Sequence, residues 1–236
     1  MNNRWRTLLV PKYIQKYNEF GQRKKLEKAR VFVKIMYEKI KRMMDIFFSV
    51  LFLFLGALPL LLVALLVKID SKGPVIFKQE RLGMNGKVFR IYKFRTMIVN
   101  AEHQGSGVYS GKHDSRVTKT GKILRATSID ELPQLINILK GEMSFIGPRP
   151  ALTYHPWTYE EYTEGQKKMF DVKPGVTGWA QVNGRKEVEW TKRIEMNVWY
   201  VENVSFLLDL KIFLMTIVKV FTNADNVNST ETAKRG

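Results

Sequence analysis

The sequence predicts an α+β protein that is mainly helical and carries a membrane helix in its N-terminal third. Three observations support this fold class. Residues 46–67 form a run of 22 uncharged residues, which is long enough to enter a bilayer. Two short segments alternate apolar and polar residues, as the strands of a hairpin do. Most remaining apolar positions are spaced three or four residues apart, as on one face of a helix.

The composition restricts the chemistry that the protein can perform. With 236 residues and 45% hydrophobic content, the chain is expected to fold around a core. Its 39 Lys and Arg against 22 Asp and Glu give a formal net charge of +17. This charge predicts anionic partners, such as nucleic acid, anionic lipids or phosphorylated small molecules. The chain has no cysteine and only three histidines, so carboxylates and basic residues must carry any catalysis.

The apolar run has two features that a simple transmembrane helix lacks. Pro59 lies in its middle, where it removes a backbone hydrogen bond and favours a kink or a break. Both flanks are basic, with 13 Lys or Arg against 3 Glu in residues 1–44, so both ends are drawn to the cytoplasmic face. A re-entrant helix that bends at Pro59 satisfies both tendencies. An ordinary spanning helix that tolerates its proline is the alternative.

The N-terminal residues 1–40 combine aromatic and aliphatic residues with dense positive charge. This pattern predicts a basic amphipathic extension that lies on anionic membrane lipids. A solvated basic arm is the alternative. At the other end of the chain, residues 223–236 are predicted to form a polar tail. Residues 41–69 then form the predicted membrane helix, and residues 70–222 form a further domain.

The strands of the predicted hairpin lie in "GPVIFKQERLG" and "KVFRIYKFRTM", with Asn85-Gly86 in the turn between them. Residues 100–119 are polar and rich in glycine, which is typical of a loop beside a substrate site or of a plain connector. Apolar spacing then predicts helical structure over residues 120–140, and Gly141 is its stop signal.

The C-terminal third contains a turn-rich segment and a helical segment. "VKPGVTGWAQVNGR" holds Pro174-Gly175 and Asn183-Gly184, so Arg185 follows a tight turn. A helix-like stretch follows. Its end, residues 206–221, is strongly apolar and is expected to lie in the membrane interface.

Asp130 and Glu131 are adjacent carboxylates in a strongly basic chain, and two interpretations are open for them. Ser128 followed by Glu131 matches a capping box, and acids in a first helical turn interact favourably with the helix dipole. Pro133 suits a cap at Asp130 better than a cap at Ser128, because it then stays in the first turn. In this interpretation the carboxylates only start a helix.

The second interpretation is catalytic. Several basic residues recur in the segments around the pair, and their convergence would suit a diphosphate: Lys93, Arg95, Arg125, Arg149 and Arg185. Adjacent Asp and Glu side chains offer the oxygen ligands that Mg²⁺ prefers. An aspartate can also attack phosphorus to give an acyl phosphate.

Six blocks of the chain, in this order, resemble one family. They are "KRMMDIFFSVLFLFLGALPLLLVALLVKI", "GPVIFKQERLG", "FRIYKFRTM", "SIDELPQLINILKGEMSFIGPRP", "KPGVTGWAQVNGR" and "FLLDLKI". They are similar to the bacterial sugar transferases, the monotopic polyprenyl-phosphate phosphoglycosyl transferases. The resemblance covers roughly residues 40 to 221 and looks like the short form, without a large preceding membrane domain.

The resemblance implies a catalytic unit held on the cytoplasmic face of the bacterial inner membrane by a re-entrant helix broken at Pro59. It implies a Mg²⁺-dependent transfer of a sugar phosphate from a UDP-sugar to polyprenyl (undecaprenyl) phosphate, which releases UMP and starts a lipid-linked glycan for exopolysaccharide, capsule or another glycoconjugate. Asp130 would be the nucleophile that forms an aspartyl-phosphosugar, with Glu131 as its metal-associated partner. Arg149 and Arg185 would lie near phosphates, and Arg125 and Lys93 are further candidates for phosphate binding.

Two rival interpretations belong to other functional classes. A non-catalytic basic membrane scaffold would need Asp130 and Glu131 only as helix caps. A nucleic-acid binder is suggested by charge alone, and the long apolar segment argues against it, so no nucleic-acid partner is expected. A homo-oligomer is compatible with the sequence.

Overall fold

The computed structural model of the protein describes the backbone of residues 6–101, 114–184 and 189–222, and the side chains of residues 32–101, 114–184 and 189–220. The chain divides into two compact units, Met1–Arg42 and Met43–Gly236. The predicted α+β class with mainly helical content is observed, because helices dominate and the described strands form two small sheets. The predicted tail at 223–236 lies outside the described residues.

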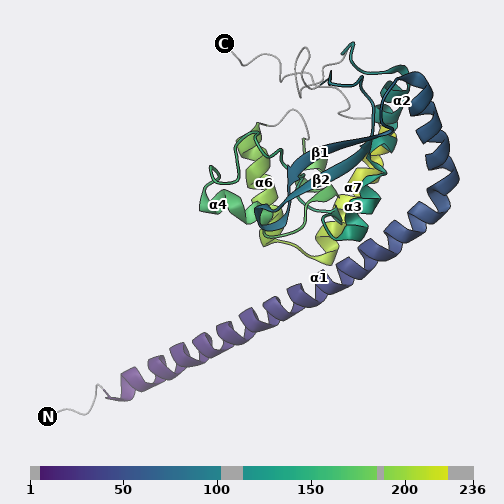
Figure 1. Ribbon diagram of the computed structural model, residues 1–236. Coiled ribbons are helices and arrows are strands. Elements are labelled where there is room, and N and C mark those ends of the chain that lie inside the picture. Colours follow the sequence, from purple (N-terminus) through teal and green to yellow (C-terminus); the bar gives the residue numbers. More distant parts are fainter. Residues whose placement is uncertain (1–5, 102–113, 185–188, 223–236) are drawn as a thin grey trace. The chain divides into compact units, whose positions relative to one another are not determined.

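Helix α1 extends from Arg6 to Asp70 (Figure 1). Its part from Phe32 to Asp70 is long and apolar enough to cross a membrane. The helix continues through Pro59, so the predicted break at this residue is not confirmed. A proline removes one hydrogen bond, and packing of the neighbouring turn at Leu60 and Val63 supports the helix there. The re-entrant path remains a prediction.

One narrow stripe of α1 packs against the rest of the second unit. Its members recur at the spacing of a single helix face: Asp45, Ser49, Leu53, Leu60, Val63, Ala64 and Val67. Most of the other described positions between residues 46 and 66 are exposed and apolar, and Phe54 is 79% exposed. An apolar surface of this extent is typical of contact with lipid rather than with water, which suggests that the protein associates with a membrane.

The predicted hairpin is confirmed. Strand β1 (Ile76–Leu82) pairs antiparallel with strand β2 (Val88–Phe94). Asn85 and Gly86 in the loop both have positive φ, of 55° and 71°, and these two residue types tolerate that conformation best. Phe89 and Ile91 of β2 are buried in a core cluster, and side chains alternate along a strand, so Lys93 shares their face.

The helical segment predicted over residues 120–140 is divided into three elements. The chain forms α2 (Lys119–Thr127), the 3₁₀ turn η4 (Ile129–Glu131) and α3 (Gln134–Lys140). Ser128 adopts a left-handed conformation with φ 58°, which ends α2 and redirects the chain. Gly141 ends α3 with φ 83°, as its position in the sequence predicts.

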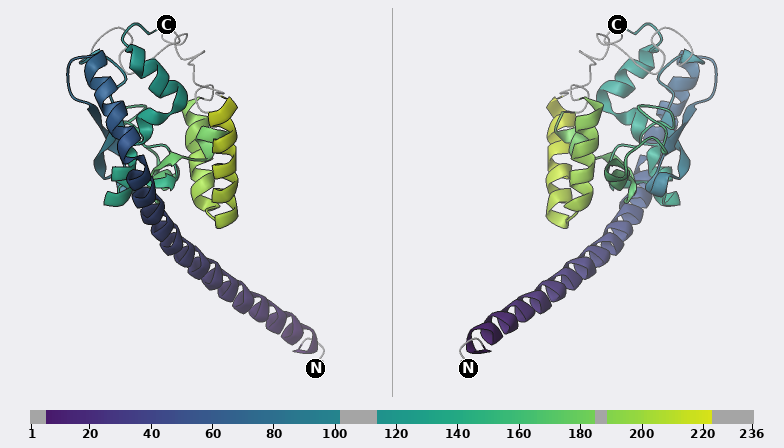
Figure 2. Two further views of the ribbon diagram at one scale, coloured as in Figure 1. Left: turned by 90° about the vertical axis from the view of Figure 1, so that its right-hand side faces the viewer. Right: turned by 90° about the vertical axis from the view of Figure 1, so that its left-hand side faces the viewer.

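The C-terminal part contains a second sheet and a pair of helices. Strand β3 (Ser144–Ile146) pairs parallel with β4 (Gly175–Thr177), so Gly175 belongs to a strand rather than to the predicted turn. The helical stretch predicted near the C-terminus is two helices, α6 (Trp190–Glu202) and α7 (Phe206–Thr222), which lie side by side (Figure 2). Short helical segments complete the fold: η2 (Met84–Gly86), α4 (Glu164–Lys167), η5 (Lys168–Phe170) and α5 (Trp179–Val182).

The face of α7 opposite its buried residues stays exposed and apolar. Ile212 of α7 packs with Tyr200 and Val201 of α6 in one core cluster. Leu207, Leu214 and Val218 are exposed, as are three phenylalanine and leucine side chains nearby: Phe206, Leu210 and Phe213. This surface fits the expected interfacial position of residues 206–221.

Asn137 is fully buried, and two of its three side-chain hydrogen bonds join α3 to the hairpin. Its Nδ2 donates to the Arg90 carbonyl at 2.8 Å and to Glu142 Oε2 at 2.7 Å. Its Oδ1 accepts from the Tyr92 backbone N–H at 3.0 Å. Asn137 thus provides hydrogen-bond partners for two backbone groups of β2 that would otherwise need water. These hydrogen bonds fix β2 next to the turn that carries Asp130.

Replacing Asn137 with alanine is expected to destabilise the protein by roughly 2–4 kcal/mol, because it leaves the Tyr92 N–H and the Arg90 carbonyl buried without a partner. Thermal unfolding of the detergent-solubilised protein measures the change. Asn203→Ala is the matched control, since Asn203 is exposed and its Nδ2 donates only to the Trp199 carbonyl at the end of α6. Equal losses in the two variants would contradict the proposed importance of Asn137.

Candidate active site

The turn η4 holds Asp130 and Glu131 between α2 and α3. The Ser128 side chain makes no capping hydrogen bond, and Pro133 occupies the N-cap position of α3. The predicted capping box at Ser128 is therefore wrong, and Asp130 does not cap α3. The reason is the left-handed Ser128, which closes α2 before the carboxylates begin. Both carboxylates lie in the first turn of η4, which the Ser128 side chain does not cap.

Glu131 forms a short ion pair with Lys93, in which Lys93 Nζ donates to Glu131 Oε1 at 2.6 Å. Both side chains are mostly buried, with 18% and 13% of their surface exposed. Burial lowers the pKa of Lys93, and the negative charge of Glu131 opposes this effect. The pair therefore joins the hairpin to the turn η4 in an environment with little solvent.

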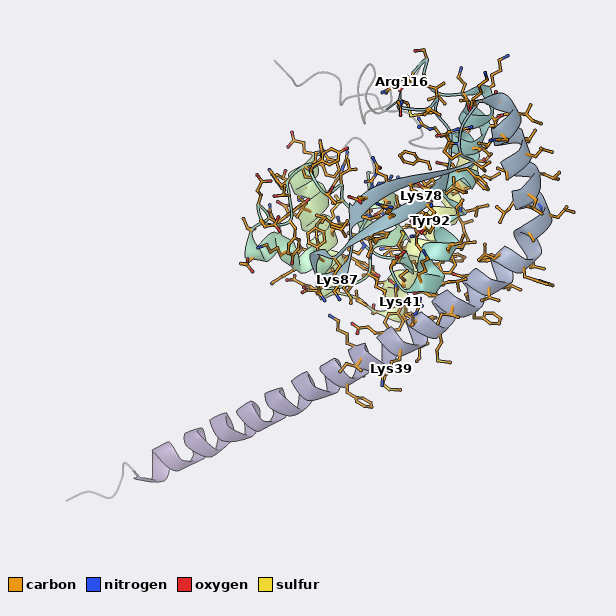
Figure 3. All side chains as sticks on the ribbon, in the orientation of Figure 1. Lys39, Lys41, Lys78, Lys87, Tyr92 and Arg116 are labelled. Atoms are coloured by element: carbon orange, nitrogen blue, oxygen red, sulfur yellow. The ribbon has the colours of Figure 1, made fainter. Side chains whose placement is uncertain are left out.

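Tyr92, the neighbour of Lys93 along β2, takes no part in this ion pair. It lies opposite Lys78 of β1 in the hairpin register, and Figure 3 shows the two labelled side by side. Lys140 Nζ donates to the Tyr92 hydroxyl at 2.7 Å. Because side chains alternate along a strand, Tyr92 and Lys93 lie on opposite faces of β2.

Asp130 is buried, with 9% of its surface exposed. Burial raises the pKa of this carboxyl, Lys93 is the strongest opposing influence, and the nearby Glu131 adds to the rise. Arg125 and Arg149 also favour the ionised form. None of the described residues donates a hydrogen bond to the Asp130 carboxylate, which leaves its oxygens available to a ligand.

Arg125 approaches the site from α2. Its Nε donates to Thr96 Oγ1 at 2.9 Å, which fixes the guanidinium beside the strand end of the hairpin. Burial lowers the pKa of Arg125, and attraction to Asp130 is the largest opposing influence. The structure therefore places this predicted residue within electrostatic reach of the carboxylate.

Arg149 lies in the Pro-Arg-Pro turn and is the most exposed of the predicted site residues that the structure describes. Its Nη1 is 4.0 Å from Glu131 Oε1, and 43% of its side chain is exposed. The root of the turn is tightly packed, because Gly147 approaches Gly178 so closely that a Cβ at Gly178 would overlap the Gly147 carbonyl. Gly147 N also donates to the Thr177 carbonyl at 2.9 Å.

Arg95, which sequence reasoning placed among the basic residues around the carboxylates, has a different role. It is buried, and its Nη2 donates to the Ser71 carbonyl at 2.6 Å and to the Val67 carbonyl at 3.3 Å. A guanidinium at the last carbonyls of a helix stabilises the helix end. Arg95 therefore holds the C-terminal end of α1 instead of joining the carboxylates.

Arg81 is a site residue that the sequence analysis missed. It belongs to β1, and its Nη1 donates to the Pro150 carbonyl at 3.1 Å, next to Arg149. Burial, followed by repulsion from Arg149, lowers its pKa to about 10, and Tyr154 and Glu131 oppose this shift. No sequence signal distinguishes it, because the strand "IFKQERL" carries charges on both faces.

The described site has more positive than negative charge. Four cationic side chains interact with the two carboxylates: Arg81, Lys93, Arg125 and Arg149. When all are ionised, two positive charges are in excess. Such an excess suits a ligand with a doubly charged diphosphate. Arg185, the remaining predicted phosphate ligand, lies outside the described residues.

The carboxylates permit a Mg²⁺ ion that is shared with a substrate. Within the described residues, no group of three or more His, Cys, Asp or Glu side chains could hold a metal alone. Mg²⁺ is, however, commonly bound by one or two carboxylates together with substrate phosphates and water. The adjacent Asp130 and Glu131 fit that mode of binding.

Comparisons with known proteins identify the family. Residues 36–223 match the family model described as bacterial sugar transferase. The chain is 45% identical over 185 residues to the "Uncharacterized sugar transferase EpsL" of Bacillus subtilis (strain 168), an alignment that covers 78% of this chain and 88% of that protein.

Two further relatives are named by their reactions. The chain is 47% identical over 188 residues to the UDP-glucose:undecaprenyl-phosphate glucose-1-phosphate transferase of Klebsiella pneumoniae, covering 78% of this chain and 40% of the relative. It is 40% identical over 190 residues to the UDP-N-acetylgalactosamine-undecaprenyl-phosphate N-acetylgalactosaminephosphotransferase of Aeromonas hydrophila, covering 79% and 45%. The chain thus spans less than half the length of these two proteins. The extent and identity of these matches show that the chain belongs to the bacterial sugar transferase family.

Proposed function

We propose that the protein transfers a sugar phosphate from a UDP-sugar to polyprenyl phosphate, with release of UMP, through a phosphosugar carried covalently on Asp130. The observation that carries this proposal is the environment of the Asp130 carboxylate. It is a buried carboxylate, it is surrounded by cations, and it accepts no hydrogen bond from the described residues. The names of the relatives support the same reaction class.

In the first step, a carboxylate oxygen of Asp130 attacks the β-phosphorus of the UDP-sugar. A bond forms between that oxygen and phosphorus, and the bond from phosphorus to the bridging oxygen breaks, so UMP leaves with that oxygen. Arg149 and Lys93 would stabilise charge on the phosphoryl oxygens, where preorganised donors have their largest effect. The product on the protein is an acyl phosphate that bears the sugar.

In the second step, a phosphate oxygen of the polyprenyl phosphate attacks the same phosphorus. The acyl phosphate bond breaks, which returns Asp130 to its carboxylate form and gives a polyprenyl diphosphosugar. The attacking lipid phosphate is an anion, so the excess positive charge of the site favours its approach. Burial of the site would limit hydrolysis of the intermediate by water.

Asp130 and Glu131 are the residues that would hold Mg²⁺, together with phosphoryl oxygens of the substrate. When bound, the ion would neutralise negative charge on the diphosphate. Glu131 is already fixed by Lys93, and this contact orients its carboxylate toward the site before any ligand arrives.

We further propose that α1 holds the protein on the cytoplasmic face of the bacterial inner membrane by a re-entrant path. The exposed apolar residues of α1 and the basic residues on both flanks of the apolar run support this placement. The exposed apolar face of α7 would lie in the same interface.

The variant Asp130→Asn should abolish covalent catalysis, because a neutral amide does not attack phosphorus to give an acyl phosphate. Without a lipid acceptor, the wild-type protein is expected to release about one equivalent of UMP and to gain the mass of a phosphosugar. The variant should lower the burst rate by more than roughly 1,000-fold and show no adduct by mass spectrometry. Glu131→Gln should lose most turnover but still allow slow adduct formation.

Two controls accompany this variant. Asp171→Asn changes an exposed carboxylate outside the site and should leave the burst unchanged. Thermal unfolding should show that Asp130→Asn is more stable than the wild type at neutral pH. Because the folded protein raises the pKa of Asp130 above 3.8, the wild type loses stability as pH rises from 3.8 through the raised pKa, and asparagine does not. An Asp130→Asn protein with normal activity would rule out the covalent mechanism.

Activity should depend on Mg²⁺, with Mn²⁺ as a substitute, because both ions prefer oxygen ligands. The measurement is UMP release in excess EDTA, followed by addition of each ion. Full turnover in the chelator would exclude the proposed metal role. Glu131→Gln should need more Mg²⁺ for half-maximal activity than the wild type, whereas Asp171→Asn should not.

The membrane topology predicts that tags at both ends of the chain are protected in sealed, right-side-out bacterial membranes. A protease-accessible N-terminal tag would contradict the re-entrant path. Replacing Pro59 with leucine restores the missing backbone hydrogen bond and should favour a straight helix. Some molecules of this variant should then expose one tag to the protease, whereas Leu58→Ala should not change the pattern.

A further inference from the structure

Strand β1 pairs with a second segment besides its hairpin partner, and that segment directly follows Arg149. Leu82 N donates to the Ala151 carbonyl at 2.9 Å. Arg81 and Leu152 form an isolated antiparallel bridge. The end of β1 is therefore fixed against the exit of the Pro-Arg-Pro turn.

The side chain of Arg81 extends this connection into the turn itself. Its Nη1 donates to the Pro150 carbonyl at 3.1 Å, and its Nη2 donates to Gln79 Oε1 at 2.6 Å. Gln79 lies two residues earlier on β1, so it anchors the guanidinium to its own strand. The prolines on both sides of Arg149 restrict the backbone there, which means that holding the Pro150 carbonyl also restricts the direction of Arg149.

The location of Arg81 is unfavourable for the free energy of folding, which is unexpected for a residue that only supports the fold. Its Nε is buried and has no hydrogen-bond partner in the described chain. Arg149 lies close enough to repel it. A half-buried cation beside another cation is unfavourable, and an apolar side chain of similar length would avoid that cost. Such a cost is typical of groups that are retained for a functional site.

We propose that Arg81 is a positioning residue of the phosphoryl-transfer site, which holds the Pro-Arg-Pro turn so that Arg149 already faces Glu131 and the phosphoryl oxygens when the UDP-sugar binds. The inference rests on the proposed function. Arg81 acts through Arg149, because its hydrogen bond reaches the backbone of the turn and not a reacting group. Its effect is therefore measurable in the first step, the release of UMP.

The test compares Arg81→Met, Arg149→Met and the double variant in the full chain, in detergent or in lipid nanodiscs. The readout is the rate of the UMP burst with UDP-glucose and with UDP-N-acetylgalactosamine, without lipid acceptor. Arg81→Met should slow the burst by roughly tenfold to 100-fold, the range for loss of a supporting contact or a small misplacement. The double variant should be as slow as Arg149→Met alone, since Arg81 has no effect once Arg149 is absent.

Arg90→Met is the matched control. Arg90 lies on the same hairpin, is exposed, and pairs with Glu80 at 3.4 Å, so its loss should not change the burst. A purely structural role for Arg81 predicts that the losses of the two single variants multiply in the double variant, and this result would overturn the inference. An Arg81→Met burst equal to that of Arg90→Met would overturn it as well.

A second variant covers the case in which Arg81→Met does not fold. Gln79→Met removes the 2.6 Å anchor of Arg81 but keeps the cation, so it should give a smaller loss that disappears in the Arg149→Met background. A Gln79→Met loss that persists there would contradict the inference. If the wild-type protein releases no UMP from any UDP-sugar, the proposed function fails instead, and that outcome is visible before any variant is compared.

Discussion

The ion pair between Lys93 and Glu131 joins the two parts of the chain that build the site. Lys93 comes from the hairpin and Glu131 from the turn between α2 and α3, and their atoms meet at 2.6 Å with little exposure to solvent. Removing either partner would leave the other charge mostly buried without its nearest counter-ion, which costs more than losing a surface ion pair. Because Asp130 is the direct neighbour of Glu131, this contact also fixes the proposed nucleophile beside the surrounding cations.

The same burial that suits Asp130 for chemistry makes it unfavourable for folding. A carboxylate that is removed from water, and that receives no hydrogen bond from the described residues, destabilises the ionised state of the folded protein. The four surrounding cations compensate for only part of this effect. A doubly charged anionic ligand would therefore be favoured in the site, because it would neutralise the excess positive charge.

The hairpin and the helix stop at Gly141 could be predicted because local residues decide them. Alternating side chains and Asn85-Gly86 define the hairpin, and glycine alone fits the positive φ after α3 without strain. The break at Ser128 could not be predicted in the same way. Serine is compatible with a helix, and its left-handed conformation depends on how α2 and α3 pack against the hairpin.

The same distinction between local sequence features and long-range packing applies to the site residues. Asp130 and Glu131 can be recognised in the sequence because they are adjacent acids in a strongly basic chain. Lys93 can be recognised as one of the basic residues in the segments around them. Arg81 and Arg95 are both arginines on or just after strands, and no local feature separates them. One faces the Pro-Arg-Pro turn and the other holds the end of α1, so their roles follow only from long-range contacts such as those to Pro150 and Ser71.

Asp45 attaches helix α1 to strand β3. It is buried on the inner stripe of α1, and its Oδ1 accepts from Ser144 Oγ and from Phe145 N, both at 3.1 Å. Strand β3 continues from these residues toward Gly147 and Arg149. A shift of α1 by one turn would move this attachment by about 5.4 Å. In the proposed membrane-bound state, the distance between the proposed reaction centre and the lipid therefore depends on how many residues of α1 separate Asp45 from the membrane surface.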